Sequence, residues 1–245
     1  DGVPGVRVLA VDDRSLALER LTPSAPTEKM AAEFGRRLAR THNAGATGFG
    51  APPHGWTGPG FFGPLQDPLP MSYADEKSWG GFYAEHRLGP MARRAALDSA
   101  TAEAVDTVIA RCRAGDFDDD EAPSRLHGDL WSGNVLTFAG KVTGLIDPAI
   151  YHGHPEIELA FMTLFGTVTR DFFDAYRERL PLDPDVRLDD GTWWRFRFMK
   201  EFCNVARPVG VQKNQLADLL RRWFGPDAGL PGEPLDCLRQ ARPIA

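Results

Sequence analysis

Residues 126–136 read Leu-His-Gly-Asp-Leu-Trp-Ser-Gly-Asn-Val-Leu, and residues 145–148 read Leu-Ile-Asp-Pro. The stretch between them, Val135–Ile146, has the length and the apolar boundaries of a β-hairpin. Asp129 and Asn134 share one tight loop, and Asp147 follows where the hairpin returns to that loop. Gly128 and Gly133 suit such a loop because glycine adopts backbone angles that are closed to other residues. The sequence therefore predicts that three oxygen-bearing side chains converge here.

The spacing of these three side chains indicates phosphoryl transfer. Protein kinases carry a His-x-Asp-x-x-x-x-Asn loop followed by a metal-binding Asp after a short hairpin, and His127 to Asp147 match that pattern position by position. Asp129 is placed to accept the proton of an attacking hydroxyl. Asn134 and Asp147 offer the oxygen ligands that Mg²⁺ prefers, so we expect ATP and Mg²⁺ as cofactors. A chance Asp-Gly turn that carries a histidine is the alternative, but it leaves the hairpin and its terminal Asp unexplained.

The composition excludes several classes of protein. The 245 residues are 42% hydrophobic and 25% charged, as in one large globular domain or a pair of lobes. A net charge of −6 argues against a nucleic-acid-binding surface, and no apolar run reaches the length of a membrane span. Cys112, Cys203 and Cys237 are far apart and odd in number, so neither a disulfide framework nor a zinc cluster is expected. A cytoplasmic location follows.

The expected elements are strands, then helices, then the hairpin, then helices again. Strands are predicted at Val6–Val11 and Ser15–Leu21, and a helix at Thr27–Asn43. Gly and Pro are dense in Ala44–Met71, which predicts a loop that packs as a lid or wall. Further helices are expected after a Ser72 cap, after a Ser99 cap and from Pro155, and at the ranges Asp171–Leu180, Thr192–Val205, Gln212–Phe224 and Leu235–Gln240.

The sequence also predicts positions or roles for several polar residues outside the loop. His42 ends the first helix and is expected to brace the catalytic loop. Arg87 is expected on a solvated face, and Asp116–Glu121 in a solvated loop. His152, His154, Glu156 and Glu158 suggest a metal cluster, but acidic residues at a helix start that follows Pro155 account for the two glutamates without a metal. Zinc is therefore not expected.

Residues 126–136 and 145–166 resemble the fructosamine kinase (ketosamine-3-kinase) family, which belongs to the aminoglycoside-phosphotransferase and choline-kinase branch of kinase-like proteins. The stretches Trp131–Gly133 and Asp147–Ala149 are particular to this family. The resemblance implies an α+β, protein-kinase-like fold. Residues 1–21 would be a remnant of a β-rich N-lobe with the hinge strand, and residues 22–245 a mainly helical C-lobe with the catalytic loop and the metal-binding hairpin.

The resemblance also implies roles for individual residues. Asp129 would orient or deprotonate a sugar hydroxyl, and Asn134 and Asp147 would hold Mg²⁺ against the ATP phosphates. Trp131 would form one face of a sugar-amine pocket. The backbone around the hinge would meet adenine, and three polar residues would support the loop. The hinge residues are Glu19, Arg20 and Leu21, and the supporting residues are His127, Glu158, where relatives commonly have Asp, and His42.

Two departures from the family pattern affect the interpretation. Relatives carry a strand lysine that contacts the phosphates, whereas no lysine of this chain precedes the hinge. We expect either that the chain lacks its front portion or that the protein lacks part of the small lobe. The family's Asp-Asn-Phe-Ile-Gly stretch is replaced by Gly58–Gly63, so contacts to the substrate there are expected to differ.

The function that the resemblance implies is an ATP-dependent kinase for ketoamines, carried by a small molecule or by protein, which amounts to deglycation. One alternative is an aminoglycoside- or choline-type alcohol phosphotransferase. The other is a catalytically inactive binding module, which the missing lysine favours. Neither a nucleic acid nor a membrane is expected as a partner.

Overall fold

The computed structural model describes residues 2–12, 15–22, 24, 27–62, 68–95, 97–165 and 168–182, and these combine helices with strands. The helices are α1 (Glu28–His42), α2 (Trp79–Tyr83), α3 (Gly89–Arg94), α4 (Ser99–Arg113), α5 (Pro155–Phe165) and α6 (Arg170–Arg177). A π-helical turn, Ala84–Leu88, joins α2 to α3, and a 3₁₀ turn covers Ser132–Asn134. The helices expected at Thr192–Val205, Gln212–Phe224 and Leu235–Gln240 lie outside the described residues.

The described strands form antiparallel pairs, each with a single partner. The pairs are β1 (Val8–Val11) with β2 (Leu16–Leu18), β3 (Gly60–Phe62) with β4 (Leu69–Met71), β5 (Ser124–Leu126) with β8 (Tyr151–Gly153), and β6 (Val135–Phe138) with β7 (Lys141–Leu145). Gly5 also forms a parallel bridge with Leu145, which attaches the first residues of the chain to β7. The catalytic loop therefore lies between the β5–β8 pair and the β6–β7 hairpin.

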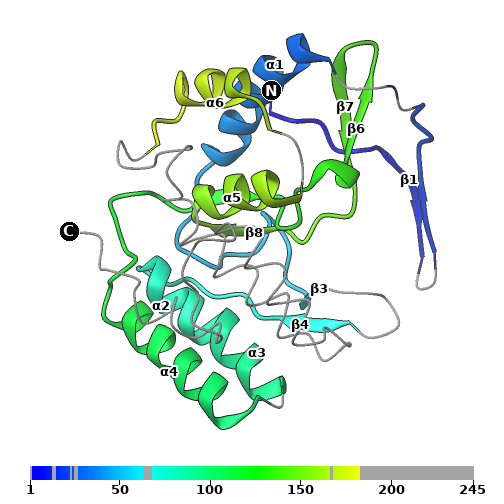
Figure 1. Cartoon of the computed structure of the whole chain (residues 1–245). Coiled ribbons are helices and arrows are strands. Elements are labelled where there is room, and N and C mark those ends of the chain that lie inside the picture. The colour runs from blue at the N-terminus through cyan, green and yellow to red at the C-terminus, as the bar shows by residue number, and fades with distance from the viewer. Residues whose placement is uncertain are drawn as a thin grey trace.

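The elements fall into three groups in space. Figure 1 shows α1 and α6 side by side at one end, next to the β6–β7 hairpin. Helix α5 and strand β8 lie in the middle, and α2, α3 and α4 form the other end. No helix within the described ranges is long and apolar enough to cross a bilayer. The middle group thus receives contacts from both ends of the molecule.

The contact between α1 and α6 is close because of a glycine. Met30, Phe34 and Leu38 form the buried face of α1, as their spacing predicts. Gly35 lies on the same helix, and a Cβ atom at this position would overlap the carbonyl oxygen of Phe172 on α6. The two backbones can therefore touch only because residue 35 has no side chain.

Several predicted elements are confirmed with small shifts. The predicted hairpin forms as β6 and β7, and α5 begins at Pro155. The first two strands are shorter than expected, since β1 and β2 cover only Val8–Val11 and Leu16–Leu18. Helix α4 begins at Ser99 itself, because Asp98 is the cap and its carboxylate accepts from the amide of Thr101 at 2.9 Å.

The helix predicted after Ser72 was wrong in position. Ser78, not Ser72, caps α2, and its hydroxyl accepts from the amide of Gly81 at 3.0 Å. Residues Leu69–Met71 form β4, in which Leu69 and Met71 are buried. The stretch predicted as a loop at 44–71 thus contains two paired strands. The Gly and Pro residues of this stretch hid the pairing, although its partners, Gly60 with Met71 and Phe62 with Leu69, are close in sequence.

The solvated face predicted for Arg87 was wrong. The guanidinium of Arg87 lies 4.6 Å from the ring centres of both Phe82 and Tyr151, and the residue is buried. The π-helical turn that contains Arg87 shifts the buried face, which a regular helical period does not anticipate. In the acidic run, the carboxylate of Asp118 accepts from the amide of Gly80 at 2.6 Å.

Candidate active site

The loop after β5 turns sharply at Gly128, where φ is 83°. A Cβ atom at this position would overlap the carbonyl oxygen of Ala149. Gly128 therefore satisfies two requirements at once, a left-handed backbone angle and a close approach of two chain segments. The second segment is the one that carries Asp147.

Three hydrogen bonds tie the catalytic loop to the Asp147 segment. The amide of Ala149 donates to the carbonyl of His127 at 2.8 Å, and the amide of Ile146 donates to the carbonyl of Asn134 at 3.1 Å. Nε2 of the His127 ring donates to the carbonyl of Ile146 at 2.8 Å. Asp147 thus follows a residue that is anchored to the loop at both its amide and its carbonyl. The loop and the segment form one unit.

Asn134 and Asp129 interact directly within that unit. The side-chain nitrogen of Asn134 donates to the backbone carbonyl of Asp129 at 2.8 Å and to its carboxylate at 3.3 Å. Because the amide nitrogen serves Asp129, the amide oxygen of Asn134 is the atom that could coordinate a cation. Nδ1 of His127 accepts from the amide of Asp129 at 3.3 Å, so the ring fixes both neighbouring segments.

Asp147 has an uncommon backbone conformation. Its φ is 52°, in the left-handed region where non-glycine residues are rare and Asp and Asn are enriched. Its side chain is exposed, whereas Asn134 is buried. Strained backbone angles of this kind concentrate at functional sites. An exposed carboxylate and an amide oxygen next to the same hydrogen-bonded unit are a donor set that suits Mg²⁺, which takes oxygen ligands and keeps several waters.

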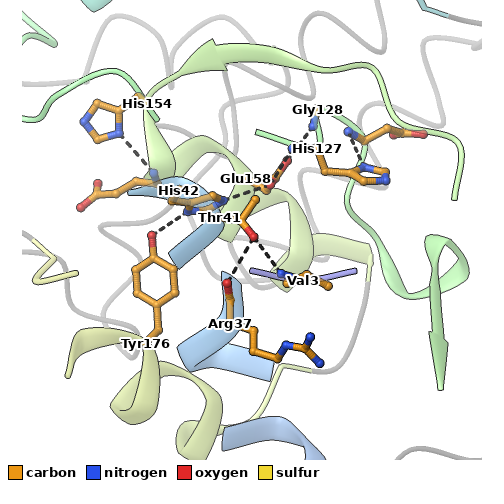
Figure 2. Close-up of polar contacts among 11 residues, drawn as sticks. Val3, Arg37, Thr41, His42, His127, Gly128, His154, Glu158 and Tyr176 are labelled. Carbon is orange, nitrogen blue, oxygen red and sulfur yellow. Dashed lines mark hydrogen bonds and ion pairs between the residues drawn. The ribbon is translucent and has the colours of Figure 1, made fainter. Parts of the chain in front are cut away.

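The side chain of Glu158 on α5 contacts the same loop from the interior of the protein. Its fully buried carboxylate accepts from the amide of Gly128 at 2.7 Å and from the amide of His127 at 3.0 Å. It also accepts from Nε2 of His42 at 3.1 Å (Figure 2). His42 in turn contacts the hydroxyl of Tyr176 through Nδ1 at 2.6 Å. A helix-start effect alone does not account for Glu158, since its carboxylate is engaged by groups outside α5.

Trp131 lies within the catalytic loop, whereas the predicted hinge residue Leu21 lies at the β6–β7 hairpin. The Trp131 side chain is 40% exposed, and its ring covers Gly133 so closely that a Cβ atom there would overlap it. Leu21, the last predicted hinge residue, lies over Gly144 of β7 together with Val6. Glu19 is held by the amide of Arg7, which donates to its carboxylate at 2.9 Å. The predicted adenine-binding segment therefore packs against the hairpin that leads to Asp147.

The histidines after Asp147 have partners other than a metal. Nε2 of His154 lies 2.9 Å from the carboxylate of Asp119, and Nδ1 of His152 donates to the carbonyl of Ala51 at 2.9 Å. Burial lowers the pKa of His152, which the bond to Ala51 only partly offsets. Within the described ranges, no three His, Cys, Asp or Glu side chains gather as metal ligands. Asp119 lies in the loop predicted at Asp116–Glu121, and its contact with His154 ties that loop to the start of α5.

The charges around His154 shift two pKa values in opposite directions. Burial opposes a charged imidazole, but the hydrogen bond and the negative charge of Asp119 outweigh it and raise the pKa of His154. Burial likewise opposes a charged Asp119, but the bond from His154 lowers the pKa of that carboxyl. Burial, followed by the charge of Glu158, raises the pKa of Tyr176 well above its ordinary value. Tyr176 therefore keeps its hydroxyl proton.

Comparison with known protein families shows to which family the chain belongs. Residues 3–190 match the fructosamine kinase family. The chain belongs to the fructosamine kinase family. The resemblance predicted from the two motifs is thereby confirmed, and so is the mixture of helices and strands that it implied.

Relatives within the fructosamine kinase family include a "Probable ketoamine kinase" of Synechocystis, which is 34% identical over 168 residues, 62% of this chain and 48% of the relative. Mouse "Ketosamine-3-kinase" is 35% identical over 120 residues, 47% of this chain and 38% of the relative. The matched part of the chain thus spans about half the length of these curated relatives or less.

Two solved structures are similar in fold. A "putative fructosamine-3-kinase" from Thermobifida fusca superposes with a TM-score of 0.69 and 33% sequence identity, covering 96% of this chain and 72% of the other. A second, from Haemophilus somnus, gives a TM-score of 0.66 at 20% identity, covering 91% of this chain and 74% of the other. The second supports the fold alone.

Sequence reasoning missed Tyr176 and Ala149 as contributors to the site. Tyr176 reaches His42 across 134 residues of sequence, and no motif joins the two. Ala149 contributes backbone atoms only, which leave no mark on residue type. The signal that could have been used is the sequence His127-Gly128, since a glycine beside a catalytic Asp indicates a close approach of another backbone.

Proposed function

We propose that this chain is an ATP- and Mg²⁺-dependent kinase that phosphorylates a sugar hydroxyl of ketoamines and has the protein-kinase-like fold. One observation carries the proposal: Asp129, Asn134 and the Asp147 segment form a single hydrogen-bonded unit in a member of the fructosamine kinase family. The division into a small lobe at residues 1–21 and a large lobe at 22–245 is part of the proposal. So is a cytoplasmic location, where ATP is available.

The residues divide the chemistry between them. Asp129 would orient the attacking hydroxyl and accept its proton, because the carboxylate lies next to the amide of Asn134 in the loop. Asn134 and Asp147 would hold Mg²⁺, which neutralises charge on the phosphates when bound. Glu158 would hold the loop from beneath by its bonds to the amides of His127 and Gly128. The protein's task in such a reaction is mainly to position groups.

The nucleotide and the sugar would be bound on either side of this unit. The backbone of Glu19, Arg20 and Leu21 would meet adenine, since Leu21 lies over the strand that leads to Asp147. Trp131 would present the face of its ring that does not cover Gly133 to the sugar amine. Its exposed side chain is consistent with a surface that a ligand covers.

The substrate class follows from the names of relatives. Matched relatives include "Ketosamine-3-kinase" of mouse and "Protein-ribulosamine 3-kinase" of Arabidopsis thaliana, the latter 33% identical over 155 residues. We infer that fructosamine- or ribulosamine-type adducts, on amino acids or on protein lysines, are phosphorylated on the third carbon of the sugar. The phosphorylated adduct would be unstable, so the reaction would remove glycation.

A catalytically inactive binding module is the second candidate. Such a module would bind MgATP or the ketoamine without turnover. An aminoglycoside- or choline-type alcohol kinase is the third reading, with the same catalytic unit and a different acceptor.

The test is incubation of the purified chain with MgATP and a panel of fructoselysine, ribuloselysine, choline and kanamycin. The expected result is ATP-dependent phosphate incorporation into the ketoamines alone. Phosphate incorporation into choline or kanamycin instead would show that the acceptor is an alcohol of that type and not a ketoamine. No incorporation, together with a melting temperature that rises with MgATP, would identify the binding module, because a ligand that binds only the folded state stabilises it.

A further inference from the structure

Three buried side chains from three helices form a chain of hydrogen bonds that ends on the catalytic loop. The hydroxyl of Tyr176 on α6 lies 2.6 Å from Nδ1 of His42 at the end of α1. Nε2 of His42 lies 3.1 Å from the carboxylate of Glu158 on α5. These side chains are fully buried, with 0% exposure for each residue. Figure 2 shows Tyr176, His42 and Glu158 pointing toward one another and then toward the loop.

The direction of donation along this chain is fixed by its two ends. The Glu158 carboxylate accepts from the amides of His127 and Gly128, so Nε2 of His42 is the donor in the bond between these side chains. A neutral imidazole that donates at Nε2 must accept at Nδ1. The Tyr176 hydroxyl is therefore the donor to His42. The hydroxyl of Tyr176 thus satisfies Nδ1 of the ring tautomer that donates to Glu158.

The helix packing brings these groups into register. Gly35 lies on α1 seven positions before His42, on the face that meets the Phe172 carbonyl of α6. Phe172 precedes Tyr176 by one helical turn, so this contact sets the height of the tyrosine along α1. Thr41 beside His42 accepts from the amide of Val3 at 2.9 Å, which adds a tie to the first residues described.

We propose that Tyr176 and His42 are positioning residues of the catalytic loop, acting through Glu158 on the amides of His127 and Gly128 and thereby on Asp129. The proposal rests on the function proposed above. Asp129 directly follows Gly128, so a displacement of that amide passes to the catalytic carboxylate. A misplacement of about 1 Å can reduce turnover about 100-fold. Tyr176 is fully buried on α6, outside the catalytic loop, so it would act on that loop through the chain of bonds.

Replacing Tyr176 by Phe distinguishes a positioning role from a purely structural one. The ring of Tyr176 packs against Phe172, and removal of the hydroxyl leaves that packing in place. Tyr176→Phe should therefore lower kcat by about ten-fold, the size expected for one buried hydrogen bond, with the KM for ATP unchanged. Tyr83→Phe is the matched control, since Tyr83 is a buried tyrosine on α2. A kcat of Tyr176→Phe equal to that of the control overturns the proposal.

A double-mutant cycle tests the route through His42. His42→Gln keeps an N–H donor toward Glu158 but offers no ring acceptor to Tyr176. In that background Tyr176→Phe should cause no further loss of kcat, because the two residues act as one unit. Losses that multiply in the double variant would show independent roles and overturn the route.

Amide hydrogen exchange gives a readout that does not depend on turnover. In Tyr176→Phe, the amides of His127 and Gly128 should exchange faster than in the unmodified chain, and in Tyr83→Phe they should not. Equal exchange in all three proteins overturns the positioning role even if activity falls. Absence of ketoamine phosphorylation by the unmodified chain overturns the proposed function instead, and exchange then still decides whether Tyr176 holds the loop.

Discussion

The position that a Cβ atom of Gly128 would occupy overlaps the carbonyl oxygen of Ala149, so the catalytic loop and the Asp147 segment are in direct backbone contact. The amide of Ala149 donates to the carbonyl of His127 at 2.8 Å across the same contact. Any side chain at residue 128 would separate the two segments. The juxtaposition of Asp129 with Asp147 therefore depends on this glycine.

Gly128→Ala should reduce turnover by more than about 100-fold and lower stability by about 2–4 kcal/mol. The physical reasons are the overlap with Ala149 and the φ of 83°. Gly45→Ala is the matched control, since Gly45 has a φ of 70° but nothing lies within 4 Å of its Cβ position. Urea denaturation gives the free energy of unfolding of both variants. Gly45→Ala introduces backbone strain alone, so the difference between the two losses measures the overlap at residue 128. Equal losses of stability would contradict the overlap.

Asp129→Ala should lower kcat by about 10²- to 10⁴-fold, or about 3–5 kcal/mol, if its carboxylate accepts the hydroxyl proton. The affinity for MgATP should change little, because Asn134 and Asp147 remain. Steady-state kinetics and titration with MgATP measure both quantities. Asp120→Ala is the control, an exposed carboxylate in the loop before β5. Unchanged turnover in Asp129→Ala would remove its assigned role.

Asp147→Asn should raise the Mg²⁺ concentration required for half-maximal activity by about ten-fold, since one charged oxygen ligand becomes neutral. Asn tolerates the left-handed φ of 52° as Asp does, so the backbone should be retained. Activity measured as a function of free Mg²⁺ at saturating ATP is the test. An unchanged metal requirement would exclude Asp147 as a ligand.

Glu158→Gln should destabilise the fold by about 2–4 kcal/mol, because a buried carboxylate that accepts three hydrogen bonds is replaced by an amide with fewer acceptor sites. One N–H of the new amide would face a donor. Chemical denaturation compared with Glu103→Gln, an exposed glutamate on α4, measures the difference. A loss no greater than that of the control would show that the contacts contribute little.

Stability should depend on pH through His154 and Asp119. The pKa of His154 is raised on folding, so its contribution is complete below the unfolded value of 6.5 and is lost as pH rises through the folded pKa. The pKa of Asp119 is lowered, so its contribution is present above 3.8 and is lost as pH falls through the folded value. Melting temperatures should therefore decline above pH 6.5.

Asp119→Asn should remove that alkaline decline, because the charge that raises the pKa of His154 is then absent and burial dominates. Melting temperatures between about pH 5 and 9, with Asp120→Asn as the control, measure the effect. The same slope in Asp119→Asn and in the unmodified chain would exclude this pair as its source.

The sequence was sufficient for the elements whose signal is local. The periodic apolar face of α1, the β6–β7 hairpin and the start of α5 at Pro155 each follow from residues within a few turns or strands of one another. It failed for Arg87, which lies against Tyr151 from a distant part of the chain, and it placed the cap of α2 at Ser72 instead of Ser78. The pairing of β3 with β4 joins residues that are close in sequence, and it was missed because Gly and Pro interrupt the strand pattern there.

The sequence by itself determined the spacing of Asp129, Asn134 and Asp147, because one turn and one hairpin fix that spacing through local backbone geometry. The family resemblance named Glu158 and His42 as supports of the loop, but only the tertiary structure decided which groups they contact. Glu158 reaches the loop from 30 residues away, and His42 reaches Glu158 across 116. These bonds form because α1 packs against α6 at Gly35 and because α5 lies next to the loop. Contacts between elements that are distant in sequence produce no periodic pattern of residue types.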